Sequence, residues 1–243
     1  MLVPKEHNAK GVALFLLGYC KLYKLAVKGC EDFGTKEELV NKIKELTILL
    51  LNLRSKGYSG SCWGYNFDWQ ARQLFLFQKH TPTVVATCFA VEALLESYEI
   101  TKDETVLAET LTAADFVIND LSRTACKGGF LFSYSIKNGN NTVINASLLG
   151  AKILSYSYKY TKNESHLEVS KQAVNAACQL QEKDGSWIYG LLTIQSRKDS
   201  FHTGFNLDAI ATYQQNTEDY SFQKYIDIGL PYYLKNFFKD DGT

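Results

Sequence analysis

Strongly apolar segments recur along the chain at intervals of about sixty residues. They cover 11–23, 83–103, 143–163 and 202–213. The second and third end in S-Y-E-I-T-K-D and S-Y-K-Y-T-K-N, which correspond at an offset of sixty. Each segment is apolar on more than one face over three to four helical turns, a pattern typical of helices buried on both sides. We therefore predict four repeats, each beginning with a buried helix.

A second, more amphipathic helix is predicted after each apolar one, beyond a short polar turn. The predicted bounds are Lys36–Arg54, Glu104–Leu121, Ser165–Gln181 and Phe222–Phe238. A segment rich in glycine and aromatic residues follows, as in G57-Y-S-G-S-C-W63 and G128-G-F-L-F-S-Y134. The repeat unit is thus an inner helix, a short turn, an outer helix and a long loop.

This unit predicts an all-α fold, the (α/α) toroid of antiparallel helical hairpins, because tetratricopeptide and HEAT repeats are shorter. We expect residues 1–243 to form one toroid domain. Four hairpins make an arc, whereas five or six close a ring, and the Gly segment at 240–243 has no inner helix after it. We therefore expect a chain truncated at its C-terminus. The alternative is a protein partner, or a second copy, that completes the ring.

The lengths of the connections predict where a site lies. Turns from inner to outer helices are short, whereas the connections from outer to inner helices run to roughly 15–25 residues. In an antiparallel stack all the long loops lie at one end, and long loops in compact domains usually carry function. We predict an aromatic-lined funnel at that end.

Two sets of motifs carry a resemblance. Q181-E-K-D-G-S-W187 resembles the Q-x₂₋₅-G-x-W signature of the terpenoid cyclase and protein prenyltransferase toroids. The chain is also similar, over nearly its whole length, to a bacterial and archaeal family of helical toroids associated with polysaccharide biosynthesis, within the six-hairpin toroid superfamily. The motifs are W63-G-Y-N-F-D-W-Q-A-R72, T81-P-T-V-V-A-T87, V143-I-N-A-S-L-L-G-A151 and F201-H-T-G-F-N-L-D-A209. The resemblance implies a toroid and a glycan or sugar-containing ligand without specifying a reaction. The D-x-D-D acid of squalene-type cyclases and the prenyltransferase zinc ligands are missing, which argues against terpenoid chemistry.

The aromatic loop at 60–72 holds the first candidate site. Asp68 is a candidate catalytic acid or base, because rings on either side would exclude water and raise its pKa. The alternative is a carboxylate that caps a turn or pairs with Arg72. The rings of the loop either stack on sugar faces or pack the loop onto the bundle. The predicted substrate-binding residues here are Trp63, Tyr65, Asn66, Trp69 and Arg72.

The run D199-S-F-H-T-G-F-N206 is the second candidate. Asp199 or Ser200 is predicted to cap a helix, which puts His202 in its first turn and Asn206 one turn further on the same face. Asp199 and His202 are predicted catalytic groups, with His202 a proton shuttle and Asn206 a substrate contact. The alternative is a half-buried histidine near a helix start.

Further substrate contacts are predicted in the other loops. Asn145 occupies the matching first turn of the preceding repeat. His80 stands just before a helix whose predicted cap is Thr81, with Pro82 as its first residue. The remaining predicted contacts are Tyr134, Trp187 and Tyr189.

Composition narrows the class of partner. Lys plus Arg (26) equals Asp plus Glu (26), so the basic excess of a nucleic-acid binder is missing. No apolar run reaches the roughly 18 residues of a membrane span and no signal segment precedes the first helix, so we expect a cytoplasmic protein. The six cysteines are far apart, without a C-x-x-C pair, and no P-loop or G-x-G-x-x-G occurs. We expect neither a metal nor a cofactor.

Two functions fit these patterns. The first is an enzyme or binding domain for a glycan or sugar nucleotide. Hydrolysis would require two carboxylates roughly 5–10 Å apart, for which Asp68 and Asp199 are the candidates. A lyase or epimerase would use Tyr65, Tyr189 or His202 instead. The second function is a non-catalytic scaffold whose rings bind a protein or polymer within a biosynthetic assembly.

Overall fold

A computed structural model of the chain describes residues 5–71, 75–137, 139–239 and 241–242. The chain packs as two compact units, Met1–Phe116 and Val117–Thr243. Both are built from helical hairpins, so the predicted all-α hairpin architecture is confirmed.

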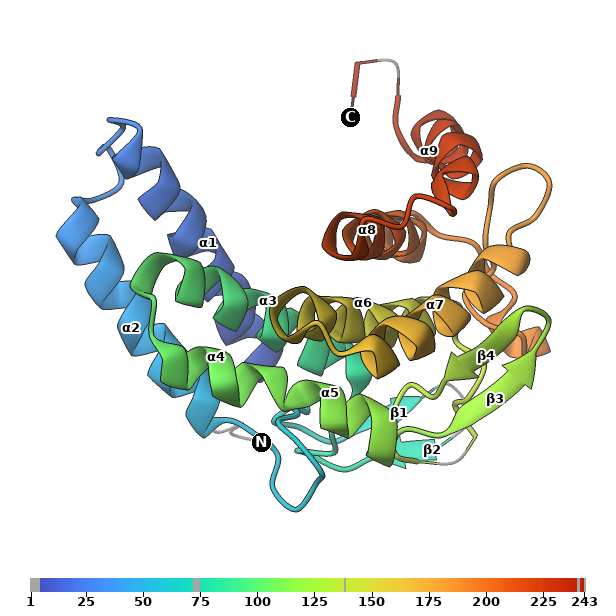
Figure 1. Cartoon of the computed structure of the whole chain (residues 1–243), viewed down its shortest axis with the longest axis horizontal. Coiled ribbons are helices and arrows are strands. Elements are labelled where there is room, and N and C mark those ends of the chain that lie inside the picture. The colour runs from blue at the N-terminus through green and yellow to red at the C-terminus, as the bar shows by residue number, and fades with distance from the viewer. Residues whose placement is uncertain (1–4, 72–74, 138, 240, 243) are drawn as a thin grey trace. The chain divides into compact units, whose positions relative to one another are not determined.

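The first unit contains two hairpins that pack through their inner helices. Helix α1 packs against both α2 and α3, and α3 leads into α4 (Figure 1). The bounds are α1 Ala9–Val27, α2 Lys36–Asn52, α3 Val84–Thr101 and α4 Glu104–Leu111.

The second unit repeats this arrangement. Helix α6 packs against α7 and α8, and α8 packs against α9 (Figure 1). The bounds are α6 Ile144–Thr161, α7 Glu164–Gln179, α8 Ser200–Thr217 and α9 Gln223–Phe237. Every residue from 144 to 155 of α6 is buried, which confirms that this inner helix is covered on all sides.

The matching S-Y-x-x-T-K-D/N tails form one repeated turn. A threonine hydroxyl donates to the carbonyl four residues back, the next residue adopts the left-handed conformation, and an Asp or Asn follows. That left-handed residue lets the helix end within one position. The Asp or Asn then accepts a hydrogen bond from the backbone N–H two residues on. The three turns are Thr101-Lys102-Asp103, Thr161-Lys162-Asn163 and Thr217-Glu218-Asp219.

The second outer helix is shorter than predicted. It ends at Leu111 rather than Leu121 and is followed by α5 (Ala113–Asp115) and the π-helical turn η1 (Phe116–Asp120). The loop after α2 presses on this break: a Cβ on Gly60 would lie 1.9 Å from the carbonyl oxygen of Thr112. The backbone N–H of Ser61 donates to Thr112 Oγ1 over 3.0 Å. An interruption of the regular α-helical hydrogen bonds, such as this π-helical turn, often occurs where another segment contacts the helix.

Two of the predicted loops contain short antiparallel hairpins. One pairs β1 (Trp69–Ala71) with β2 (Phe75–Phe77), and the other pairs β3 (Arg123–Cys126) with β4 (Gly129–Phe132). The tight turn between β3 and β4 uses Gly128 and Gly129, both at positive φ, which glycine adopts without a steric penalty. These segments are too short for an alternating pattern to distinguish them from irregular loops.

Candidate functional site

The rings of the loop before α3 form a series that runs from the surface into the core. Exposed Phe67 stacks on Tyr65, with centroids 5.6 Å apart, and Tyr65 meets Trp69 edge-on at 6.1 Å. Trp69 stacks on fully buried Phe77 at 4.2 Å. Tyr65 and Trp69 are therefore half-buried and held by neighbouring rings. Their contact with a sugar stays a prediction.

Asp68 stands outside this series. Its side chain is exposed, so the predicted exclusion of water by flanking rings is wrong. Its Oδ1 accepts a hydrogen bond from the backbone N–H of Lys79 over 2.6 Å. That contact fits the alternative interpretation, a loop carboxylate that holds a turn. A catalytic role for Asp68 stays a prediction.

Trp63 and Trp187 perform the same structural task in the two units. The indole N–H of Trp63 donates to the carbonyl of Leu50 over 2.8 Å, and that of Trp187 donates to Ala177 over 3.0 Å. Both carbonyls lie two residues before the end of an outer helix, where each also accepts from the backbone N–H of the residue that caps the helix, over 3.2 Å. Both rings are buried, at 0% and 2% exposure, so neither presents a face to a sugar. This placement corrects the expectation that they line a funnel.

The remaining predicted residues of the first unit lie around the same loop. Asn66 is half-buried and exchanges hydrogen bonds with Asn8 and Glu6. His80 is exposed and adopts a left-handed backbone at φ 64°. The helix cap predicted at Thr81 is wrong: α3 is capped by Thr83, whose hydroxyl accepts from the N–H of Ala86.

The shift of the cap has a local cause, because Pro82 forms a β-bridge with Gly64 and so stays in extended conformation. Arg72, predicted to bind substrate or pair with Asp68, lies outside the described residues.

The second unit brings Asp199 and His202 together at the start of α8. Asp199 is the N-cap, as predicted, and its Oδ1 accepts from the backbone N–H of His202 over 2.9 Å. The same carboxylate lies 2.8 Å from Nδ1 of the imidazole. One residue thus caps the helix and orients the ring. The predicted position of His202 in the first turn is confirmed.

Tyr189 completes a four-residue cluster. Its ring contacts two groups of the cluster: the centroid of the His202 ring lies 4.5 Å from the Tyr189 centroid, and Cζ of Arg197 lies 4.0 Å from it. Arg197 also reaches Asp199, with Nε 3.5 Å from Oδ2. The backbone N–H of Tyr189 donates to the carbonyl of Arg197 over 2.8 Å, which holds the loop against itself. All four residues are half-buried, so the cluster is in part accessible to solvent.

The cluster keeps its carboxylate ionised. Burial alone would raise the pKa of Asp199, but hydrogen bonds from the backbone and ring of His202, with the charge of Arg197, outweigh burial and lower the pKa. Because Nδ1 faces a carboxylate, it carries the proton, and Nε2 is left with the lone pair when the ring is neutral. No hydrogen bond of Nε2 is found among the described residues.

Two buried amides lie on the helices beside the cluster. Asn206 stands one turn after His202 on α8, and Asn145 stands in the first turn of α6. The side-chain oxygen of each has no hydrogen-bond partner in the described part of the chain. A buried acceptor without a partner costs about 1–3 kcal/mol, and functional sites are where proteins tolerate that cost. Tyr134 is also buried, at 8% exposure, and lies in the interior rather than at a binding surface.

Sequence reasoning missed one residue of the cluster and one charged pair on the neighbouring helices. Arg197 was not predicted, although its position two residues before the cap at Asp199 was a usable signal. A second charged pair joins α6 to α8, with Lys152 Nζ 2.7 Å from Asp208 Oδ2. No local pattern indicates that pair, since its members are 56 residues apart.

The predicted pairing of Asp68 with Asp199 stays a prediction, because the two acids belong to different units. Over the described residues, no group of three His, Cys, Asp or Glu side chains is arranged to hold a metal ion. None of the helices in that same part of the chain is both long and apolar enough to cross a membrane.

The helical hairpins place the chain in the (α/α)-toroid class of folds. It is similar to D-mannose isomerase (13% identity, TM-score 0.65, covering 96% of this chain and 60% of that one). It is similar to cellobiose 2-epimerase from Bacillus thermoamylovorans (12% identity, TM-score 0.68, 96% and 61%). It is also similar to a glycoside hydrolase family 76 mannosidase from Bacteroides thetaiotaomicron (13% identity, TM-score 0.66, 95% and 60%).

The chain therefore spans about 60% of the length of these structures. Identity at this level establishes the fold alone. No protein-family model and no curated protein sequence matches the chain.

Proposed function

We propose that this chain acts on a sugar by transferring a proton at the carbon beside the carbonyl of the open-chain form, as an aldose–ketose isomerase does. The observation that carries the proposal is the 2.8 Å contact between the Asp199 carboxylate and Nδ1 of His202. A carboxylate in that position fixes the tautomer of the ring, so that Nε2 is the basic nitrogen. His202 is then a general base of defined orientation.

The reaction balances with one such base. Nε2 of His202 removes the proton from C2 of the aldose, and the electron pair forms the C1–C2 double bond of an enediolate. The imidazolium then returns the proton to C1, while the proton of the C2 hydroxyl moves to the oxygen at C1, which yields the ketose. Asp199 stabilises the imidazolium throughout. Arg197 and Tyr189 hold Asp199 and the ring in place, since each contacts one of them.

Hydrolysis is less well supported by the same cluster. A glycosidase requires a carboxylic acid whose pKa is raised so that it can protonate the leaving oxygen. The pKa of Asp199 is lowered instead, and its oxygens are engaged by His202 and Arg197. The cluster therefore contains a base and its orienting group, but no acid of the required kind.

Two of the structurally similar proteins are named as a sugar isomerase and a sugar epimerase, D-mannose isomerase and cellobiose 2-epimerase. We extend that chemistry to this chain as part of the proposal. A role in polysaccharide biosynthesis, implied by the sequence resemblance, belongs to the proposal as well: the product would be a sugar that feeds a polymerising pathway.

The test is isotope exchange. The 243-residue chain is incubated in D₂O with D-mannose, D-glucose and D-fructose, and deuterium at C1 and C2 is followed by proton NMR. We expect time-dependent incorporation with at least one sugar, and its loss in His202→Gln. His166→Gln is the matched control, because His166 lies on α7 and contacts Ser157 and Asn163 rather than the cluster.

Asp199 requires a variant that separates its two roles. Asp199→Ser keeps a good N-cap residue but removes the charge beside Nδ1. We expect thermal stability close to that of the parent and exchange reduced by about 10²–10⁴-fold, the range for removal of a group that orients a catalytic histidine. Exchange that persists in His202→Gln at the parent rate would overturn the proposal.

A non-catalytic scaffold is the second candidate. It is favoured by exposed apolar side chains along α9 and just after it, which offer a surface for a protein. They are Ile228, Leu230, Leu234 and Phe238. Sugar binding without exchange in any of the three sugars would favour this function over the first.

A further inference from the structure

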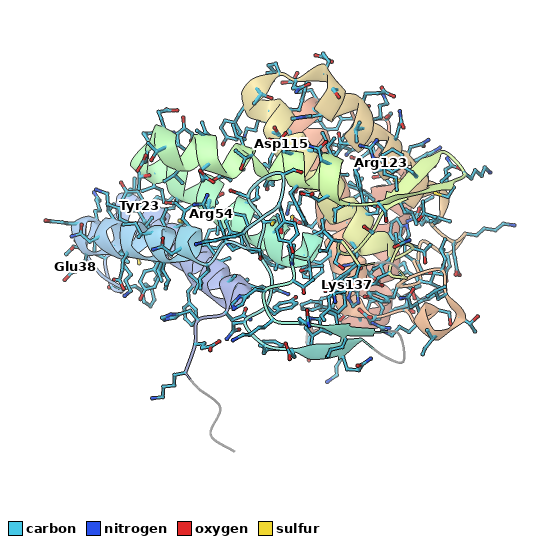
Figure 2. All side chains as sticks on the ribbon, turned by 90° about the horizontal axis from the view of Figure 1, so that it is seen from below. Tyr23, Glu38, Arg54, Asp115, Arg123 and Lys137 are labelled. Atoms are coloured by element: carbon cyan, nitrogen blue, oxygen red, sulfur yellow. The ribbon has the colours of Figure 1, made fainter. Side chains whose placement is uncertain are left out.

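Two adjoining cavities lie in the first unit. One has a volume of about 540 Å³ and the other about 490 Å³. They share the walls formed by the loop after α2, where Arg54 is labelled in Figure 2. The second cavity, here called the basic groove, is lined by Asn52, Leu53, Arg54, Ser55, Lys56, Tyr58, Gln78, Lys79, His80 and Thr81.

The lining of the basic groove carries cations but no carboxylate. Arg54 is neutralised, because it pairs with Glu109 in the adjoining cavity and donates to the carbonyl of Leu51. Lys56 and Lys79 are exposed, and neither forms an ion pair within the described residues. The groove therefore presents two lysine ammonium groups, with the Asp68 carboxylate bound to the backbone N–H of Lys79, and its concave surface concentrates the potential felt by an anion.

The backbone on one side of the groove is held rigidly. The N–H of Lys79 donates to Asp68, and the N–H of His80 donates to the carbonyl of Tyr65 over 2.6 Å. On the opposite side, the hydroxyl of Ser55 donates to the carbonyl of His80 over 2.8 Å. These contacts hold His80 in a left-handed conformation that costs a residue other than glycine about 1 kcal/mol or more.

These contacts give the aromatic loop a structural role instead of a catalytic one. Asp68 and Tyr65 fix the segment that presents Lys79 and His80 to the groove. Strained backbone held by several hydrogen bonds is characteristic of ligand-binding segments. The opposite wall offers the ring of Tyr58, itself packed edge-on against Phe116 at 6.3 Å, as a surface for an apolar sugar face.

We infer that the basic groove binds a saccharide that bears an anionic group, either a carboxylate or a phosphate. Lys56 and Lys79 neutralise the anion, His80 and Gln78 hydrogen-bond to oxygens, and Tyr58 contacts the ring. The saccharide part of this inference rests on the proposed function. The anion part rests only on the groove.

The experiment is a titration of the ¹⁵N-labelled chain followed by NMR, with glucuronate, glucose 6-phosphate, inorganic phosphate and glucose as probes. We expect shifts in the amides of Ser55, Lys79 and His80 with the two anionic sugars. Glucose should bind at least tenfold more weakly, and affinity should fall as salt rises from 20 to 200 mM, roughly across the range where screening sets in. Glucuronate against glucose 6-phosphate distinguishes a carboxylate from a phosphate ligand.

The decisive variant is Lys56→Glu/Lys79→Glu, which reverses both charges on exposed side chains. We expect affinity for the anionic sugars to fall at least tenfold, while Lys36→Glu, at the far end of α2, leaves it unchanged. Equal binding by parent and double variant, or equal binding of glucose and glucuronate, would overturn the inference. Binding of inorganic phosphate as tightly as glucose 6-phosphate would overturn only its saccharide part.

Failure here and failure of the proposed function are distinguishable. Exchange at His202 is measured with neutral sugars, and we expect it to be unaltered in Lys56→Glu/Lys79→Glu. If the chain catalyses exchange but does not bind the anionic sugars, the proposed function stands and the inference about the basic groove fails.

Discussion

The ammonium of Lys152 lies 2.7 Å from Oδ2 of Asp208, and this contact joins the two inner helices of the second unit. The two partners differ in environment, since the Lys152 side chain is 2% exposed and that of Asp208 is 57% exposed. A buried ammonium is costly unless an opposite charge neutralises it. Asp208 is therefore the counter-charge that allows a lysine within the buried part of α6.

Removing only one partner should destabilise the chain. We expect Asp208→Asn to lower the free energy of unfolding by about 2–4 kcal/mol, somewhat less than for a fully buried pair because Asp208 is half in water. Lys152→Met/Asp208→Leu removes both charges and should lie within about 1 kcal/mol of the parent. Urea denaturation measures both. A loss below about 0.5 kcal/mol in Asp208→Asn would mean that water already neutralises Lys152.

Trp63 and Trp187 should contribute equally to the free energy of unfolding. Trp63→Phe and Trp187→Phe each remove one of the two hydrogen bonds to a helix carbonyl and leave a small void, so we expect the free energy of unfolding to fall by about 1–3 kcal/mol in each variant. Trp69→Phe is the matched control: Trp69 is half-buried in a loop, and we expect a change below 1 kcal/mol. Thermal unfolding followed by circular dichroism gives the comparison. A cost for Trp69→Phe equal to the others would contradict the assignment.

The ionisation of Asp219 should make the free energy of unfolding depend on pH in the acidic range. Burial alone would raise its pKa, but hydrogen bonds from Ser221 and Lys171 lower the pKa from 3.8 to about 2. The folded pKa is below the unfolded one, so the stabilisation is present above about pH 4 and is lost as pH falls toward 2.

We expect Asp219→Asn to cost about 1–2 kcal/mol at pH 7, allowing for solvent screening, and nearly nothing at pH 2. Chemical denaturation at several pH values checks this. A cost that stays constant with pH would show that the charge of Asp219 is not responsible.

The cysteines should divide into two classes of reactivity. Cys20, Cys62, Cys88 and Cys178 are buried, and burial raises the pKa of Cys20 to about 12, so little thiolate forms. Cys30 and Cys126 are half-buried. We expect a disulfide reagent at pH 8 to modify Cys30 first and Cys126 more slowly, because burial raises the pKa of Cys126 as well. Mass mapping identifies the sites, and early labelling of Cys178 would contradict the packing of α7.

The repeat and its local turns and caps could be predicted from the linear pattern of residues. The sixty-residue period, the threonine turns after the inner helices and the cap at Asp199 all depend on contacts within a few residues, which a linear pattern records directly. The placement of His202 beside Asp199 followed from the same local geometry. The class of fold could be predicted because each hairpin repeats these signals.

Which of the candidate residues face solvent, and which partners they have, depends on the tertiary packing. Trp63 and Trp187 stand in aromatic loops like Tyr65, yet they are buried, and each donates its indole N–H to a carbonyl of the preceding outer helix. Asp68 became the support of Lys79 through a contact eleven residues away. Burial and charge compensation arise from segments distant in sequence, so residue type and spacing alone do not specify them.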